Sequence, residues 1–213
     1  MTHYPKGALW IGTGLLLIVA SLSLCGWNQL ESVRAGAAAK AIVRDLEDFV
    51  SSAASPSEAS ETELPDYTLD PNMDMPVETI NGYDSIGLLE IPVLNLRLPV
   101  LSDWSYPQLQ ISPCRYKGSV YTNTLIIAAH NYASHFGQLK ELHTGDRVLF
   151  TDIDGNRFYY TVSELEILLP SATDEMENGD WDLTLFTCTI GGQSRVTLRC
   201  VRTEAPPTAV LPT

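Results

Sequence analysis

The sequence has few cysteines and few basic side chains. Its 213 residues include 4 Cys, and 13 Lys and Arg face 26 Asp and Glu, which gives a net charge of −13. The cysteines and histidines show no C-x-x-C or H-x-x-x-H spacing, so the common zinc-ligand patterns are missing. An acidic chain does not complement the phosphate backbone of nucleic acids, and we therefore expect no nucleic-acid partner.

Charge is also missing near the amino end. No charged side chain occurs between Gly7 and Leu30, and this run is rich in Leu and Ile, with Trp10 and Trp27 near its ends. A helix of about 20 apolar residues crosses the hydrocarbon core of a bilayer, and Trp favours the interfaces. The run is longer than the apolar part of a usual signal peptide and lacks a small-residue cleavage site. We therefore predict an uncleaved transmembrane anchor at residues 7–30.

The short head, residues 1–6, indicates the orientation of that anchor. It carries Lys6, and a head of this length favours an amino terminus inside the cell. The prediction is a single-pass protein of the cell membrane, with the bulk of the chain extracellular.

Two segments of different composition follow the anchor. Residues 31–50 carry apolar side chains at helical spacing, including Ile42 and Leu46, which predicts a stalk helix. The alternative is a helix that packs on the catalytic domain and regulates access to it. Residues 51–78 are predicted to be an acidic flexible linker. Between Ser51 and Met75 this segment holds six acidic side chains and no Lys or Arg, and such a composition buries little apolar surface.

The rest of the chain consists of short runs rich in Val, Ile, Leu, Tyr and Thr. Several such strands with few helices predict a closed or nearly closed β-barrel at residues 79–203, followed by a disordered tail at 204–213. A short helix is expected at 134–142 and a hairpin turn at Asp154-Gly155. The predicted strands are Ile86–Ile91, Leu96–Leu101, Ser119–Ala129, Arg147–Thr151, Phe158–Leu168, Leu183–Thr189 and Ser194–Arg202.

The last two predicted strands flank Gly191-Gly192, which is typical of a two-residue hairpin turn. That turn places Cys188 directly opposite Arg195, where Cβ atoms lie about 5 Å apart. Arg199 shares the same side of its strand but lies about 13 Å further along it, at about 3.3 Å per residue. Arg195 is therefore the candidate partner of the thiol, whereas Arg199 is expected to contact substrate or to pair with a carboxylate.

Several motifs between residues 85 and 202 together resemble the sortase family, the cell-surface transpeptidases of Gram-positive bacteria. The resemblance implies an eight-stranded β-barrel with short helices in its loops and no cofactor. The A-H-N and T-L-F-T-C-T-I-G-G blocks look more like the class D-like or divergent clostridial enzymes than the best-known housekeeping type. The motifs are Leu125-Ile126-Ile127-Ala128-Ala129-His130-Asn131, His135-Phe136-Gly137, Thr144-Gly145-Asp146, Thr184-Leu185-Phe186-Thr187-Cys188 and Arg195-Val196-Thr197-Leu198-Arg199.

In this family pattern three residues match the catalytic positions. A free thiol is mostly protonated at neutral pH, so Cys188 needs a nearby base or cation, which His130 supplies before it protonates the leaving amine. Arg195 would hold the substrate and the developing oxyanion. The expected substrate-binding residues are Ala129, Asn131, Thr187 and Arg199.

The implied reaction is acyl transfer. Cys188 would attack the Thr carbonyl of an LPxTG-like sorting signal, form a thioacyl-enzyme, and pass the protein to an amine of a peptidoglycan precursor or of another protein. Three alternatives remain open: a pilin-polymerising sortase, a cysteine peptidase, and a non-catalytic peptide-binding surface barrel. Pilin polymerases usually carry a lid with an Asp-Pro-Trp or similar motif, which Asp70-Pro71-Asn72 matches only in part, so attachment of proteins to the cell wall is favoured.

The remaining cysteines, histidines and acidic residues are given structural interpretations. Cys114 and Cys200 are expected to be buried free thiols, with a disulfide between them left open. His135 is expected to cap or pack a helix. The acidic stretch 174–180 is interpreted as a solvated loop, so we predict no metal site.

Overall fold

The computed structural model describes residues 6–53 and 64–205, and it divides into two units, one up to residue 34 and one from residue 35 onward. Helix α1 (Lys6–Ala53) contributes to both units. Three parts of our predictions lie outside the described residues: most of the head, the middle of the predicted linker at 54–63, and the tail from residue 206.

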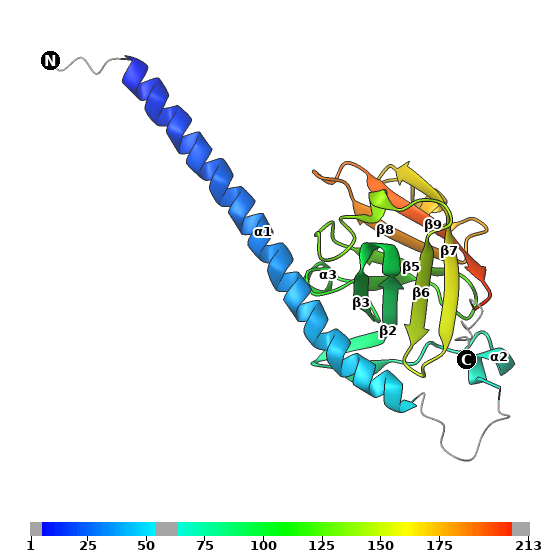
Figure 1. Cartoon of the computed structure of the whole chain (residues 1–213). Helices are drawn as coiled ribbons and strands as arrows, with labels where there is room; N and C mark the ends of the chain where they lie inside the picture. The colour runs from blue at the N-terminus through cyan, green and yellow to red at the C-terminus, as the bar shows by residue number, and fades with distance from the viewer. Residues whose placement is uncertain (1–5, 54–63, 206–213) are drawn as a thin grey trace, which may run out of the picture. The chain divides into compact units, whose positions relative to one another are not determined.

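The first unit consists of the amino-terminal part of α1, in blue in Figure 1. Its large apolar side chains are exposed, for example Leu9, Trp10 and Leu16. By length and composition this is the one described helix that could cross a membrane. The predicted anchor is thus a helix of the expected apolar character.

In the second unit, the carboxyl-terminal part of α1 packs on the sheet. Ile42 and Leu46 are almost fully buried in a cluster with Ile80, Leu88 and Ile153. Burying side chains of this size stabilises a fold by about 2 kcal/mol each. Packing on the domain, the alternative to a simple stalk, is therefore what the structure shows.

Polar contacts hold this part of the helix as well. The Asn81 side chain donates to Asp45 Oδ2 at 2.8 Å, and Arg97 forms an ion pair with Glu47 at 2.5 Å. Gly36 allows an unusually close approach, because a Cβ atom there would lie 2.8 Å from Ser134 Cβ. The helix thus contacts the loop that follows the predicted His130 strand.

Within the described residues, nine strands form one sheet in the order β1-β2-β3-β4-β5-β8-β9-β7-β6. An additional pairing of β2 with β6 closes eight of them into a barrel, so the predicted eight-stranded barrel is confirmed (Figure 1). The short β1 pairs only with β2 and lies outside the closed ring. The strands are β1 (Glu78–Ile80), β2 (Tyr83–Ile91), β3 (Leu96–Leu101), β4 (Cys114–Lys117), β5 (Leu125–Ala129), β6 (Arg147–Asp152), β7 (Arg157–Leu168), β8 (Leu183–Cys188) and β9 (Arg195–Thr203).

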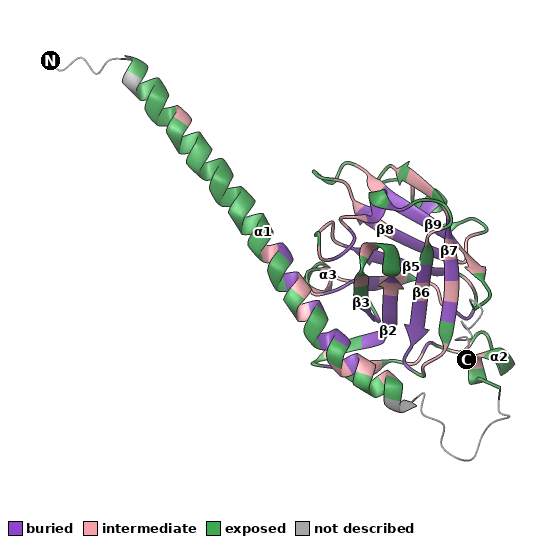
Figure 2. Ribbon diagram, in the orientation of Figure 1, coloured by how far each residue is buried: buried purple, intermediate pink, exposed green. Residues whose placement is uncertain are grey.

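The helices besides α1 are all short. They lie in the connections of the barrel: α2 (Asp66–Leu69), η1 (Pro92–Leu94), α3 (Tyr106–Leu109), η2 (Leu139–Glu141) and α4 (Thr173–Glu177). Buried residues line the strands, as the purple ribbon in Figure 2 shows. All five residues of β5 are buried, which places the end of this strand at a rigid position.

The strand predictions are correct where alternation of side chains is regular and wrong where turn residues intervene. Strand β3 has the predicted bounds, whereas the prediction that begins at Ser119 is too long. Residues before Leu125 form a turn, in which Asn123 has φ 55°. Strand β4 was missed because two of its four residues are basic. The helix expected at 134–142 is wrong as well, since only the single 3-10 turn of η2 forms there.

The prediction of a flexible linker at 51–78 is wrong at both ends. Helix α1 continues to Ala53, and the carboxyl-terminal part of the segment packs on the barrel. The ring of Tyr67 stacks on Tyr121 with centroids 4.8 Å apart, and Met75 is 3% exposed. These apolar anchors outweigh the acidic composition, which alone suggested a solvated chain.

Candidate active site

Two adjacent strand ends bring the predicted catalytic residues together. Strands β5 and β8 are parallel, with Ala129 opposite Thr187, so His130 and Cys188 are the next residues along both strands. In the antiparallel pair β8 and β9, Cys188 lies opposite Arg195, as the hairpin arithmetic predicted. The register of three strands therefore converges on one spot at the edge of the barrel.

The turn that sets this register differs from the predicted one. The Gly192 N–H donates to the Thr189 carbonyl at 2.8 Å, and Gly191 and Gly192 have φ of 86° and 72°. Such positive φ values favour glycine. The connection is thus longer than two residues, but it is centred on the same Gly-Gly pair, so it preserves the opposition of Cys188 and Arg195.

His130, Cys188 and Arg195 line a common pocket of about 190 Å³. The structure thus brings together the three side chains that the sequence motifs singled out. Other parts of the wall come from the connection between β7 and β8, including Leu169, Pro170 and Met176. A peptide that enters this pocket would meet the thiol, the imidazole and the guanidinium at once.

The guanidinium of Arg195 is held by the hairpin that carries it. Its Nη1 donates to the carbonyls of Gly192 and Ser194, each at 3.2 Å. These bonds restrict the rotamers of the side chain and keep its charge beside the pocket. A preorganised cation of this kind can stabilise negative charge that develops on a bound carbonyl oxygen.

His130 begins a tightly closed loop. The Phe136 N–H donates to the His130 carbonyl at 3.1 Å, and the Gly137 N–H donates to the Tyr132 carbonyl at 2.9 Å. A Cβ atom on Gly137 would lie 2.7 Å from the Asn131 carbonyl oxygen, so only glycine fits this closure. The Tyr132 ring lies over the His130 ring with centroids 4.8 Å apart, which orients the imidazole.

His135 lies behind this loop and is completely buried. Neither ring nitrogen makes a hydrogen bond of standard geometry within the described part of the chain, although the backbones of Ala35 and Ile111 lie near the ring and oppose part of the pKa shift. Burial, together with the neighbouring charge of His130, lowers the pKa of His135 to about 4. The prediction that His135 packs is correct, although no helix is there for it to cap.

Acid should destabilise the protein through His135. Its pKa is near 6.5 in the unfolded chain and about 4 in the folded one, so the unfolded state binds the extra proton first. Above pH 6.5, His135 is neutral in both states and does not lower the free energy of unfolding. As the pH drops to 4, its protonation in the unfolded state lowers the free energy of unfolding by about 3 kcal/mol. Urea unfolding of the His135→Phe variant should show a weaker dependence on pH across this window. The exposed His143→Gln variant should retain the full dependence, and equal slopes in both variants would contradict this assignment.

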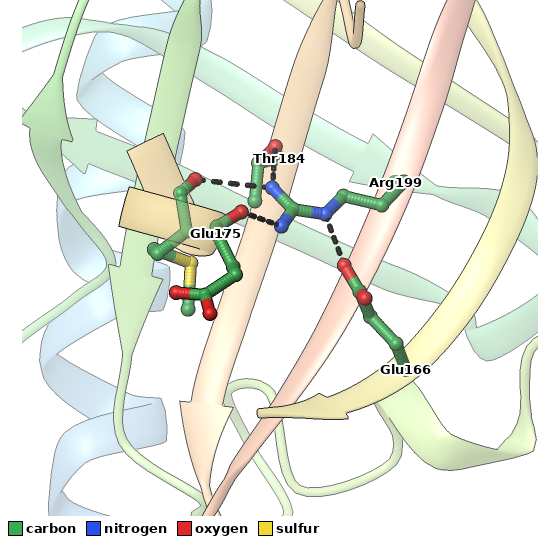
Figure 3. A network of polar contacts seen from close by, with 5 residues as sticks. Glu166, Glu175, Thr184 and Arg199 are labelled. Carbon is green, nitrogen blue, oxygen red and sulfur yellow. Dashed lines mark hydrogen bonds and ion pairs between the residues drawn. The ribbon is translucent and has the colours of Figure 1, made fainter. Parts of the chain in front are cut away.

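Arg199 lies outside the pocket of Cys188, which argues against its predicted role in substrate binding. It is 2% exposed and does not line the pocket. Figure 3 shows its guanidinium between Glu166, Thr184 and the backbone of α4. It donates to Glu166 Oε1 at 2.5 Å, to Thr184 Oγ1 at 3.0 Å, and to the carbonyls of Glu175 and Met176. Pairing with a carboxylate, the other option left open, is the one observed.

The other three predicted substrate-binding residues differ in position. Ala129 lines the pocket of His130, and Asn131 lines a second pocket that also includes Cys188. Thr187 is buried, and its hydroxyl donates to the Ala129 carbonyl at 2.8 Å. The hydroxyl of Thr187 therefore links β8 to β5 at the residue before Cys188.

An aromatic wall of the pocket was missed by sequence reasoning. The rings of Trp104, Tyr116 and Phe186 lie next to one another, with centroids 5.9 and 5.4 Å apart in that order. Phe186 could have been found, because it is two residues before Cys188 and so shares its face of the strand. Tyr116 belongs to the strand that was missed, and Trp104 lies in a loop.

All four cysteines are free thiols, so the disulfide left open between Cys114 and Cys200 does not form. Both of these thiols are buried, and burial raises the pKa of each to about 12. Cys188 is partly exposed in the pocket. The three cysteines of the barrel thus differ in access from the pocket.

Alkylation should distinguish these cysteines. Because the thiolate is the reactive form, iodoacetamide should modify Cys188 within minutes and leave Cys114 and Cys200 unmodified until the protein is unfolded. Peptide mapping by mass spectrometry gives the site of each adduct. Fast labelling of Cys114 or Cys200 in the folded protein would contradict the packing described above.

The acidic stretch 174–180 is mostly exposed, as predicted for a solvated loop, although Met176 is buried and Glu177 is half-buried. Glu177 forms an ion pair with Lys117 and accepts a hydrogen bond from the Tyr116 hydroxyl at 3.3 Å. The hydrogen bond from Lys117 lowers the pKa of Glu177. No group of His, Cys, Asp or Glu that could hold a metal ion occurs in residues 6–53 and 64–205. Of these carboxylates, that of Glu177 links α4 to Lys117 and Tyr116 of β4.

Comparison with known proteins agrees with this geometry. The Sortase domain model matches residues 89–203, and no curated protein matches the sequence. Three similar solved structures are sortase C1 from Streptococcus suis (25% identity, TM-score 0.51, covering 59% of this chain and 76% of that one), a sortase D5 transpeptidase from Clostridium perfringens (22%, 0.54, 76% and 99%) and sortase C from Streptococcus pneumoniae (20%, 0.58, 77% and 97%).

The family model covers more than half of the chain and runs from within β2 to the end of β9. The chain belongs to the sortase family. Family and fold together support a cysteine transpeptidase as the general class of activity.

Proposed function

We propose that this protein is a membrane-anchored sortase that attaches surface proteins to the cell wall. The observation that carries the proposal is the shared pocket of His130, Cys188 and Arg195. A nucleophile, a proton carrier and a fixed cation on one wall are the groups that acyl transfer from a peptide requires.

In the proposed reaction, Cys188 Sγ attacks the Thr carbonyl of an LPxTG-like sorting signal as a thiolate. Arg195 stabilises the oxyanion, and the imidazolium of His130 protonates the leaving amine, so the peptide bond breaks and a thioester remains. A second amine then attacks the thioester. The new C–N bond forms, the C–S pair returns to Cys188, and His130 takes the proton of the amine.

The apolar unit of α1 supports the anchor. We propose that residues 7–30 cross the cell membrane once with the amino terminus inside, which places the barrel outside the cytoplasm together with its substrates. The amine acceptor is a peptidoglycan precursor or another protein. The class D-like or divergent clostridial subclass remains part of the proposal and rests on the A-H-N and T-L-F-T-C-T-I-G-G blocks.

Attachment to the cell wall is favoured over pilus polymerisation by the position of the segment before the barrel. Tyr67 of α2 packs on Tyr121 and Phe158, and no described residue between 64 and 78 lines the pocket of Cys188. The Asp70-Pro71 pair thus does not cover the thiol as a lid would.

The test compares the amounts of transpeptidation product and hydrolysis product that form from a sorting-signal peptide. The full chain in detergent is incubated with quenched LPxTG-like peptides, with and without amine acceptors, and mass spectrometry identifies the products. The proposal predicts a new amide between the Thr carbonyl and the acceptor. Hydrolysis alone at saturating acceptor would favour the cysteine peptidase, and peptide binding without cleavage would favour the non-catalytic barrel.

A further inference from the structure

Cys188 lines two pockets, and the catalytic proposal uses only the first. The second, of about 370 Å³, is lined among others by Asn131, Gly137, Thr187 and Lys140. Cys188 thus lies between the first pocket, which has an aromatic wall, and the second pocket, which includes polar side chains and Lys140.

The alternation of strand β8 explains why the two pockets are separate. Successive side chains of a strand point to opposite faces. Phe186 lines the first pocket, whereas Thr187 and the following Thr189 line the second. Cys188 is the last residue of the strand and lines both pockets.

When the acyl chain of the first substrate occupies one pocket, the other pocket is open to a second substrate. In a thioacyl-enzyme the acyl chain is bound to Cys188 Sγ and fills the pocket of His130 and Arg195. An acceptor amine must then approach the thioester carbon from another direction. The pocket beside Thr187 and Asn131 offers this approach.

Charge in the second pocket indicates the chemistry of that acceptor. Lys140 is the only charged residue among those that line it, and it forms no ion pair with any described residue. Lys140 belongs to η2 and is exposed, which keeps its ammonium group available. An ammonium group attracts a carboxylate and repels a second cation.

We infer that the pocket beside Lys140 receives the acceptor and favours an amine that carries a carboxylate on a neighbouring atom. The inference rests on the proposed function, because it assigns the second substrate of the same reaction. Lys140 selects among acceptors and takes no part in forming the thioester.

The first experiment measures selectivity during turnover. Glycine and glycinamide, which differ in the carboxylate, compete for the thioacyl-enzyme of the full chain in detergent, and chromatography gives the ratio of the two products. Lys140→Gln should lower the glycine to glycinamide ratio by about threefold to fivefold, as expected for one partly solvated ion pair. Lys140→Glu should lower it further. Because the ratios are compared between variants, the difference in amine basicity cancels.

Two controls accompany this comparison. Arg157→Gln removes the same charge from an exposed position of β7 that lines neither pocket, and it should leave the ratio unchanged. Raising the salt concentration to 1 M should reduce the wild-type ratio, since screening weakens exposed ion pairs. A ratio that is the same in the wild type, Lys140→Gln and Lys140→Glu would overturn the inference.

A second readout requires no catalysis. At high concentration, glycine should slow the alkylation of Cys188 more than glycinamide does, and Lys140→Glu should abolish this difference. Protection without any product would support the pocket and contradict the proposed transpeptidase. Product formation that does not depend on Lys140 would support the proposed transpeptidase and contradict the role of Lys140 in the acceptor pocket.

Discussion

Replacing His130 by glutamine should lower the rate of peptide cleavage by about 10²-fold to 10⁴-fold, the usual contribution of a general acid or base. Glutamine retains a polar side chain of similar length but cannot carry the proton that the leaving amine needs. The rate is measured with a quenched LPxTG-like peptide. Because His130 is partly exposed, the melting temperature should change by less than about 2 °C.

His143→Gln is the matched control for this prediction. It makes the same change at an exposed position that does not line the pocket of Cys188. Its cleavage rate should equal that of the wild type. If His130→Gln also cleaved the peptide at a rate within twofold of the wild type, His130 would have no role in proton transfer.

Replacing Arg199 by methionine should destabilise the protein by about 3 kcal/mol, because it removes a buried guanidinium and leaves its partners unpaired. Glu166 and the carbonyls of Glu175 and Met176 would lose their donor (Figure 3). For a domain of this size the melting temperature should fall by about 10 °C. Differential scanning calorimetry of the detergent-solubilised chain measures the change.

Arg195→Met is the comparison that separates the two arginines. Its guanidinium bonds only carbonyls of its own hairpin within the described residues, so its loss should cost little stability. The cleavage rate should nevertheless fall by about 10²-fold, as when one oxyanion donor is removed. If Arg195→Met lowered the melting temperature more than Arg199→Met, the assignment of the two roles would be reversed.

The sequence predicted the centre of the site because short-range rules determine it. Alternation along strands and a Gly-Gly turn set which residues face each other, and Cys188 and Arg195 follow from those rules even though the turn is longer than expected. The proximity of His130 to Cys188 depends on the parallel pairing of β5 with β8. That pairing was accessible only through the family resemblance.

The parts that sequence reasoning missed depend on contacts between distant segments. The burial of Arg199 requires the carbonyls of α4, and the packing of Tyr67 requires Tyr121, more than 50 residues away in the sequence. Neither contact leaves a periodic signal in the chain. The acidic composition of residues 51–78 suggested solvation, because composition averages over the few apolar side chains that hold the segment.

The packing of α1 also changes how the protein should be shortened for experiments. Ile42 and Leu46 belong to a buried cluster, so a fragment that begins near Thr79 would expose apolar surface. We therefore specify the full chain in detergent for each assay.

The mass of the reaction intermediate tests the role of Cys188 most directly. Wild-type protein is mixed with an LPxTG-like peptide in the absence of amine, quenched with acid after a short time, and analysed by intact mass spectrometry and peptide mapping. A thioacyl-enzyme should show a mass increase equal to the acyl part of the peptide, located on Cys188 and removed by hydroxylamine. Cleavage of the peptide by the wild type with no adduct on Cys188, or an equal adduct in Cys188→Ala, would contradict this role of Cys188.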